Sequence, residues 1–252
     1  MIEKTQGYII ARKIYRDTSL LLKIYTREFG KIEGIVKGVR KIDDYGRYDG
    51  LLDLFSEYEV VFYRRRRSEL KLFVQFYLLN SCWDFTRDYK IFCVLSSGFE
   101  FLDFIMPWEQ PSGKVYELIG EFLNCLDVRS VESYYYAFLF KLLKLSGFNP
   151  QIDECILCGE KVRGEAYFSI HEGGLICPRC KDRVRNLRKL SPGVIKSINF
   201  LEQEPWINVS RLKLSTEVKR ELKKLVRDFI GFHLDYIPRT WGLLDREKIL
   251  SI

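Results

Sequence analysis

The sequence predicts an α+β protein in which a small N-terminal β-barrel precedes an α-helical domain that a four-cysteine, zinc-ribbon-like element interrupts. Short segments rich in β-branched and aromatic residues fill the first part, helical periodicity follows, and two Cys-x-x-Cys pairs lie within the helical part. The predicted boundaries are 1–80 for the barrel, 81–150 and 188–252 for the two helical parts, and 151–187 for the cysteine element.

The barrel is predicted from five strand-like segments separated by polar or glycine-bearing turns. They are 8–15, 20–26, 31–38, 57–63 and 70–78. Gly30, Gly34 and Gly38 recur every four residues around the third segment. At this spacing they suit the bends of a small barrel better than a phosphate-binding loop.

Helices are predicted where apolar residues recur at helical spacing. One begins at Ser112 and a second spans 131–145. Beyond the cysteines, Ser191 is typical of an N-cap because a proline follows it, and 216–237 carries a long apolar stripe. The stripe includes His233, which we interpret as a packed histidine because its neighbours at helical spacing are apolar.

The cysteine spacing is the clearest functional signal. The pairs Cys155/Cys158 and Cys177/Cys180 are separated by 18 residues, and 166–176 between them reads as a hairpin. Each pair lets two thiolates converge from one tight turn, and the hairpin returns the second turn to the first. Four thiolates leave no open coordination position, so we predict one structural Zn²⁺ per chain that does not activate water.

Two other interpretations of these cysteines are a disulfide pair and a thioredoxin-like redox couple. The missing secretory signal disfavours the first, and the second needs one Cys-x-x-Cys after a strand. The remaining cysteines, Cys82, Cys93 and Cys125, lie among apolar residues and read as small core residues.

Basic residues cluster at the predicted strand ends, which matters more than the moderate formal net charge of +7. On loops at a barrel rim they suit a phosphate backbone, whereas a solvated hairpin tip is the simpler alternative for the four-arginine run. The candidate nucleic-acid-binding residues are Lys37, Arg40, Lys41, Arg64, Arg65, Arg66 and Arg67. A second basic stretch, 179–189, is a weaker candidate.

Aromatic residues of the barrel segments are candidates for base stacking, although core packing is the simpler role for any one of them. They are Tyr8, Tyr15, Tyr25, Tyr58, Phe62 and Tyr63.

Enzyme signatures are missing. The chain has no P-loop, no G-x-G-x-x-G after a strand, no G-x-S-x-G and no H-E-x-x-H, and only two histidines. We therefore expect a binding protein rather than an enzyme. Apolar runs are far shorter than the roughly 18 residues that span a bilayer, and no signal-peptide core is visible, so we expect a cytoplasmic protein without a membrane partner.

Several motifs resemble the RecO family of bacterial recombination mediators. They are GYII at 7–10, RDTSLL at 16–21, YTREFGKI at 25–32 and VKGVR at 36–40, followed by GFNP at 147–150, CILCG at 155–159 and GGLICPRC at 173–180. The resemblance covers the whole chain in order and length. It implies an oligonucleotide-binding (OB) fold, a helical domain and a zinc element that some relatives have lost.

The resemblance also implies a function. RecO proteins bind single- and double-stranded DNA, anneal strands coated with single-stranded DNA-binding protein, and assist RecA loading together with RecR. A contact between the helical domain and the C-terminal tail of single-stranded DNA-binding protein is implied as well. The expected location is the bacterial cytoplasm, in association with the nucleoid.

Two features depart from the family pattern. Many relatives have a basic residue followed by serine near the C-terminus, where this chain reads PRTWGLL at 238–244, and Arg64 to Arg67 match no family motif. Two other functions stay open at this point: an RNA-binding zinc-ribbon factor of translation or transcription, and a metal-dependent hydrolase, which needs an open metal site.

Overall fold

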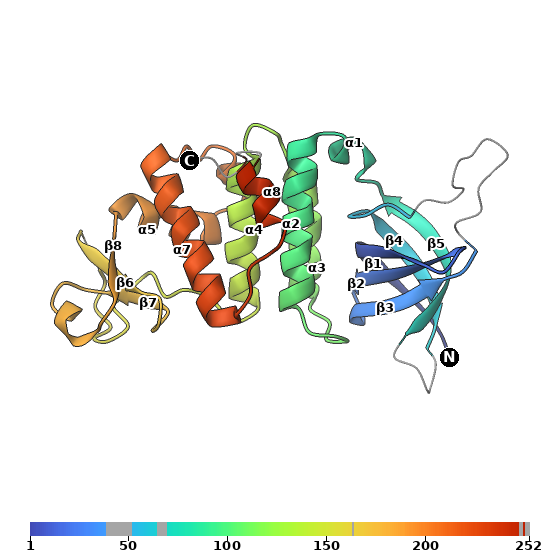
Figure 1. Ribbon diagram of the computed structural model, residues 1–252, viewed down its shortest axis with the longest axis horizontal. Coiled ribbons are helices and arrows are strands. Elements are labelled where there is room, and N and C mark those ends of the chain that lie inside the picture. The colour runs from blue at the N-terminus through green and yellow to red at the C-terminus, as the bar shows by residue number, and fades with distance from the viewer. Residues whose placement is uncertain (39–51, 65–69, 163, 247–248, 250–252) are drawn as a thin grey trace. The chain divides into compact units, whose positions relative to one another are not determined.

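A computed structural model of the chain describes residues 1–38, 52–64, 70–162, 164–246 and 249 (Figure 1). The described chain forms two compact units, Met1–Asn124 and Cys125–Ile252. A closed five-stranded barrel opens the first unit, helices follow it, and the cysteines lie in the second unit. The predicted α+β class is therefore confirmed, while the domain boundaries at 80, 150 and 187 stay predictions.

The barrel closes in the order β1-β2-β3-β5-β4, the blue to cyan strands of Figure 1. Its neighbours are antiparallel except β3 and β5, which are parallel with Gly34 opposite Lys71. The strands are β1 Ile2–Tyr15, β2 Ser19–Thr26, β3 Gly30–Val36, β4 Glu57–Tyr63 and β5 Lys71–Asn80. The buried apolar cluster inside the barrel is Ile9, Leu20, Leu22, Ile24, Ile32, Val36, Leu52, Tyr58, Val60, Phe62 and Phe73.

Strand β1 is longer than predicted. It begins at Ile2 instead of residue 8, and its first half pairs with β4 while its second half pairs with β2. The register shifts between Ile9 and Ala11, where the strand changes partner. The sequence did not predict this extension because part of the first half faces solvent and carries polar residues.

Two glycines of β3 permit close approaches of neighbouring segments. A Cβ atom on Gly34 would lie 2.6 Å from the Phe73 ring and 2.7 Å from the carbonyl oxygen of Lys71. Gly30 has a φ of +64°, and a Cβ there would lie 2.3 Å from the carbonyl oxygen of Gln110. Both positions therefore serve packing of the barrel rather than a phosphate cradle.

Among the described residues, the first unit also contains the helices α1 Trp83–Thr86, α2 Tyr89–Ile105 and α3 Gly113–Cys125. Helix α3 starts directly after Ser112, as predicted. Helix α2 was not predicted, although Asp88 caps it by accepting from the backbone N–H groups of Lys90 and Ile91. The loop between α2 and α3 packs on the barrel, where the Glu109 N–H donates to the carbonyl oxygen of Lys31 at 3.0 Å.

The described part of the second unit contains the helices α4 Val131–Leu145, α5 Pro192–Gln203, α6 Trp206–Val209, α7 Thr216–Leu234 and α8 Trp241–Arg246. Ser191 caps α5 as predicted, by accepting from the Val194 N–H. Helix α7 ends three residues earlier than predicted because Asp235 adopts a left-handed conformation with φ of 48°. Among the described residues, no helix has the length and hydropathy needed to cross a membrane.

The cysteine element contains a three-stranded sheet in the order β7-β6-β8. The predicted hairpin is confirmed, with Ser169 of β6 opposite Gly174 of β7. The third strand was not predicted, because Arg188 and Lys189 give it the appearance of a charged loop. The elements are β6 Ala166–Ser169, β7 Gly174–Ile176, the 3-10 helix η1 Lys181–Arg183 and β8 Leu187–Leu190.

Candidate metal centre and nucleic-acid interface

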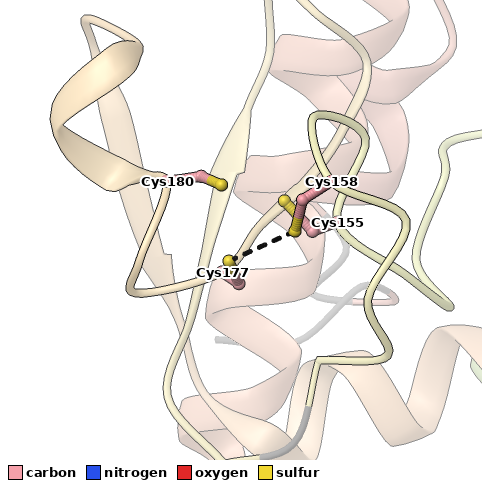
Figure 2. A group of neighbouring side chains, drawn as sticks. All are labelled: Cys155, Cys158, Cys177 and Cys180. Atoms are coloured by element: carbon pink, nitrogen blue, oxygen red, sulfur yellow. Dashed lines mark hydrogen bonds between the residues drawn. The ribbon is translucent and has the colours of Figure 1, made fainter.

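The four predicted cysteines converge in the second unit. The sulfur atoms of Cys155, Cys158, Cys177 and Cys180 all lie within 4.8 Å of one another, and Figure 2 shows them pointing toward a common centre. The dashed line in Figure 2 joins the sulfurs of Cys158 and Cys177, which lie 3.8 Å apart. The group is therefore close enough to hold one metal ion.

Tight turns place each pair of cysteines. The Gly159 N–H donates to the Cys155 carbonyl oxygen at 2.8 Å, and Gly159 takes a φ of 70° that suits glycine. In the second pair, the Cys180 N–H donates to the Cys177 carbonyl oxygen at 3.0 Å. The two-residue spacer of each motif thus folds back on itself and brings its sulfurs together.

The thiols around this centre have perturbed acidities. Burial alone would raise the pKa of Cys155, but backbone hydrogen bonds, the strongest from Cys177, lower it to about 6. Burial and neighbouring thiols raise the pKa of Cys180 to about 12. Four thiols at this separation are a soft, closed donor set, which fits a divalent metal bound by four thiolates.

Acidic neighbours neutralise part of the basic stretch 179–189. Three of its cations form ion pairs: Arg179 with Glu160, Lys189 with Glu165 at 2.6 Å, and Arg188 with Asp228. Arg183 and Arg185 are exposed. Since half of the positive side chains have acidic partners, this stretch is a weaker candidate for phosphate contacts than its sequence indicates.

Two of the seven candidate nucleic-acid-binding residues can be located on the barrel. Lys37 is exposed just after β3, and Arg64 is half-exposed just after β4. The Arg64 guanidinium pairs with the Glu109 carboxylate, with 3.0 Å between Nη2 and Oε2. The other five, Arg40, Lys41, Arg65, Arg66 and Arg67, lie outside the described residues.

Most of the aromatic candidates for stacking belong to the core. Tyr8, Tyr25, Tyr58 and Phe62 are buried. Tyr63 is exposed and Tyr15 is half-buried, so these two keep a face for a ligand. Sequence patterns did not single out other exposed aromatic side chains of the first unit, namely Tyr77, Trp83, Tyr89, Phe92, Phe104 and Trp108.

A small apolar pocket lies among α4, α7 and α8 of the second unit. The Trp241 indole N–H donates to the Tyr135 hydroxyl at 2.6 Å, and the Arg227 guanidinium lies 5.7 Å from the Trp241 ring centre. The buried Tyr136 hydroxyl has no hydrogen-bond partner within the described chain. The lining residues are Tyr135, Tyr136, Leu139, Lys223, Val226, Arg227, Trp241 and Asp245.

Comparisons with known proteins cover both units. The family model described as Recombination protein O N terminal matches residues 1–82, and the one described as Recombination protein O C terminal matches residues 87–240. Relatives named DNA repair protein RecO include one from Syntrophus aciditrophicus, 26% identical over 254 residues, covering 99% of this chain and 97% of the relative. Another, from Dehalococcoides mccartyi, is 28% identical over 246 residues, covering 96% of this chain and 94% of the relative.

Proposed function

Because the chain belongs to the RecO family of DNA repair proteins, we propose that it is a DNA-binding mediator of recombinational repair. In this role it binds single- and double-stranded DNA, anneals strands coated with single-stranded DNA-binding protein, and assists RecA loading together with RecR. The observation that carries the proposal is the match of both RecO models, which together span the barrel and most of the second unit. The role requires no catalytic residue and implies a DNA-associated location in the bacterial cytoplasm.

The proposed mechanism is electrostatic. Lys37 and Arg64 stand on the barrel beside a run of further basic residues in the sequence, and together they neutralise phosphates of bound strands. Two strands gathered on one basic surface repel each other less and meet at a higher local concentration. Base pairing then supplies the free energy of annealing.

We propose that the four cysteines hold one structural Zn²⁺. The supporting observation is the approach of all four sulfurs to within 4.8 Å of one another. Zinc bound by four thiolates supplies cross-linking of the fold and has no position for a reacting water. Cys155 and Cys158 join the segment before β6 to the segment after β7, which carries Cys177 and Cys180.

For the tail of single-stranded DNA-binding protein, we propose the pocket lined by Trp241 and Arg227. An aromatic residue at the end of an acidic tail suits an apolar slot flanked by cations, here Lys223 and Arg227, which share the Asp245 carboxylate when no tail is bound. Arg227→Gln should weaken binding of a fluorescent tail peptide, while Arg220→Gln, exposed on the same helix, serves as the charge-matched control. Equal affinities of both variants and the parent would remove the pocket from the interaction.

Annealing provides the direct test of the proposed function. Two complementary oligonucleotides coated with single-stranded DNA-binding protein are mixed with the protein across a salt series, and duplex formation is followed by fluorescence transfer. We expect acceleration that declines with salt. Absence of acceleration with intact fold, together with equal or better affinity for RNA, would instead favour an RNA-binding factor.

Variants localise the DNA surface. Lys37→Ser and Arg64→Ser should each reduce the slope of log affinity against log salt for single strands by about 0.7, the value for one lost phosphate contact. Lys196→Ser, exposed on α5, is the control and should leave the slope unchanged. Unchanged slopes in the two barrel variants would remove Lys37 and Arg64 from the surface.

A further inference from the structure

One carboxylate holds two cations at the end of the barrel. Glu109, in the loop between α2 and α3, accepts from Lys71 through Oε1 and from Arg64 through Oε2, the latter at 3.0 Å. Arg64 follows β4, and Lys71 is the first residue of β5. The two cations are thus brought together at one anion by the pairing of neighbouring strands.

Burial of the three side chains is unequal. The Lys71 side chain is 6% exposed, whereas those of Arg64 and Glu109 are 49% and 42% exposed. A buried ammonium group needs an anion, because an unpaired buried charge is costly. The Glu109 carboxylate already borders water, so it can rotate into solvent when another anion takes its place beside Lys71. Lys71 is therefore the fixed part of this cluster, and the anion beside it is the exchangeable part.

The backbone of Glu109 is held against the barrel. Its N–H donates to the Lys31 carbonyl oxygen at 3.0 Å, and it adopts a φ of 53°, which is uncommon outside glycine. The lack of a side chain at Gly30 lets the Gln110 backbone approach closely. Exchange of the anion therefore needs only rotation of the Glu109 side chain, not movement of the loop.

Open space adjoins the two cations. A cavity of about 190 Å³ is lined by Arg64, Lys71 and Glu109 together with the apolar side chains of Phe29, Ile32 and Phe62 and with Glu28. A second hollow shares Ile32 and Glu109 and includes Trp108, whose side chain is exposed. Phe62 belongs to the barrel core, but the half-buried Phe29 and the exposed Trp108 suit the face of an unpaired base next to the phosphate that the cations attract.

We propose that Arg64 and Lys71 form a phosphodiester-binding site for single-stranded DNA, and that the Glu109 carboxylate occupies this site until DNA displaces it. The inference rests on the proposed DNA binding and adds two residues, Lys71 and Glu109, to the DNA surface. Hydrogen bonds from Lys71, and its charge with that of Arg64, lower the pKa of Glu109, which agrees with a carboxylate that is ionised when DNA is absent.

Removal of the Glu109 charge should open the site. Glu109→Gln keeps an oxygen acceptor but no longer competes with phosphate as an anion. We expect a gain in affinity for an oligothymidylate of about threefold to tenfold at low salt, and a slope of log affinity against log salt steeper by about 0.7. Glu117→Gln, exposed on α3, changes the net charge equally and controls for long-range repulsion.

The test is fluorescence anisotropy of the labelled oligonucleotide across a salt series, with thermal melting of each variant to verify its fold. Equal effects of Glu109→Gln and Glu117→Gln, or weaker binding by Glu109→Gln, would overturn the inference. A parent protein that binds no DNA would instead overturn the proposed function, so the two failures are distinguishable.

A second variant covers the case in which Glu109→Gln destabilises the barrel. Lys71→Met removes the buried cation while keeping a long side chain, and it leaves Glu109 and Arg64 in place. If the site exists, Lys71→Met should reduce the slope of log affinity against log salt by about 0.7 relative to the parent, the value for one lost phosphate contact. An unchanged slope in a folded Lys71→Met variant would contradict the inference.

Discussion

The buried cluster inside the barrel has eleven apolar residues, whereas the buried cluster around the cysteines has one isoleucine and three cysteines. The barrel strands pair around a complete circle, and aromatic rings such as those of Phe62 and Phe73, 6.0 Å apart, fill its centre. The cysteine element has only short strands around Ile176. We expect the first region to fold on apolar burial alone, and the second to depend on the proposed metal ion as well.

Metal removal should produce the largest difference in stability between the barrel and the cysteine element. Structural zinc contributes about 10 kcal/mol or more to the folding of small zinc domains. We therefore expect Cys155→Ser, or a strong chelator, to abolish amide exchange protection in β6 and β7 while β1 to β5 keep theirs. Hydrogen exchange followed by mass spectrometry measures both regions in one sample.

Cys125→Ser is the control for the cysteine substitution, since Cys125 lies outside the four-sulfur group. It should retain one zinc per chain by metal analysis. Retention of protection in β6 and β7 after complete metal loss would show that the cysteine element folds on packing alone.

A substitution at Gly34 should affect the barrel instead. The added Cβ of Gly34→Ala would lie 2.6 Å from the Phe73 ring, so β3 and β5 must separate. We expect a loss of about 1–3 kcal/mol in the free energy of unfolding of the first unit, measured by denaturant titration. Gly113→Ala adds a Cβ in open space at the start of α3 and should not lower the free energy of unfolding. Equal effects of both variants would argue against close packing between β3 and β5.

A smaller loss of stability is expected from a substitution at His233, where the hairpin of the cysteine element contacts α7. His233 Nε2 is 2.7 Å from the Ile170 carbonyl oxygen, and its ring lies 4.4 Å from that of Phe229. His233→Phe keeps the ring but leaves the carbonyl unpaired, at a cost of about 1 kcal/mol. Thermal melting with zinc bound measures the loss, and His171→Phe, at an exposed position, is the control. No difference between the variants would show that the hydrogen bond of His233 does not stabilise this element.

The smallest expected effect is the pH-dependent contribution of the Glu109 ion pairs to the stability of the first unit. Its pKa is lowered in the folded protein, chiefly by the hydrogen bond from Lys71. The ion pairs therefore stabilise the first unit above the unfolded pKa of about 4.3, and this contribution disappears as pH falls through the folded pKa. Because Glu109 is partly exposed and the glutamine oxygen can still accept from Lys71, we expect Glu109→Gln to lower the free energy of unfolding by less than about 1 kcal/mol at pH 7, and by progressively less as pH falls through the folded pKa. A cost that does not vary with pH would exclude the carboxylate charge as its source.

Periodicity and spacing predicted most of the fold. The barrel strands, the hairpin between the cysteine pairs and the cap at Ser191 all follow from local patterns. Helix α2 was not predicted because it is buried on most sides, from Ile91 to Leu102, so its apolar residues form no stripe along one face. Strand β8 was not predicted because its charged side chains are typical of a loop. In the structure they pair with acidic residues that are distant in sequence.

The candidate sites also include features that the sequence predicted and features that it did not. The cysteine group was predictable because its ligands come in two local motifs. The partner of Arg64 was not, since Glu109 lies 45 residues further along the chain and reaches it only through the fold. Lys71 was overlooked because a lysine at the start of a strand is expected to face solvent, yet here it is buried.

The early start of β1 has a practical consequence for anyone who produces this protein. The Arg64 N–H donates to the Met1 carbonyl oxygen at 3.0 Å, so the first residue is already hydrogen-bonded beside the proposed phosphodiester site. An affinity tag fused ahead of Met1 would emerge next to Arg64, and a histidine-rich or basic tag there would add its own charge to any DNA measurement. Binding constants are therefore best compared after such a tag has been removed.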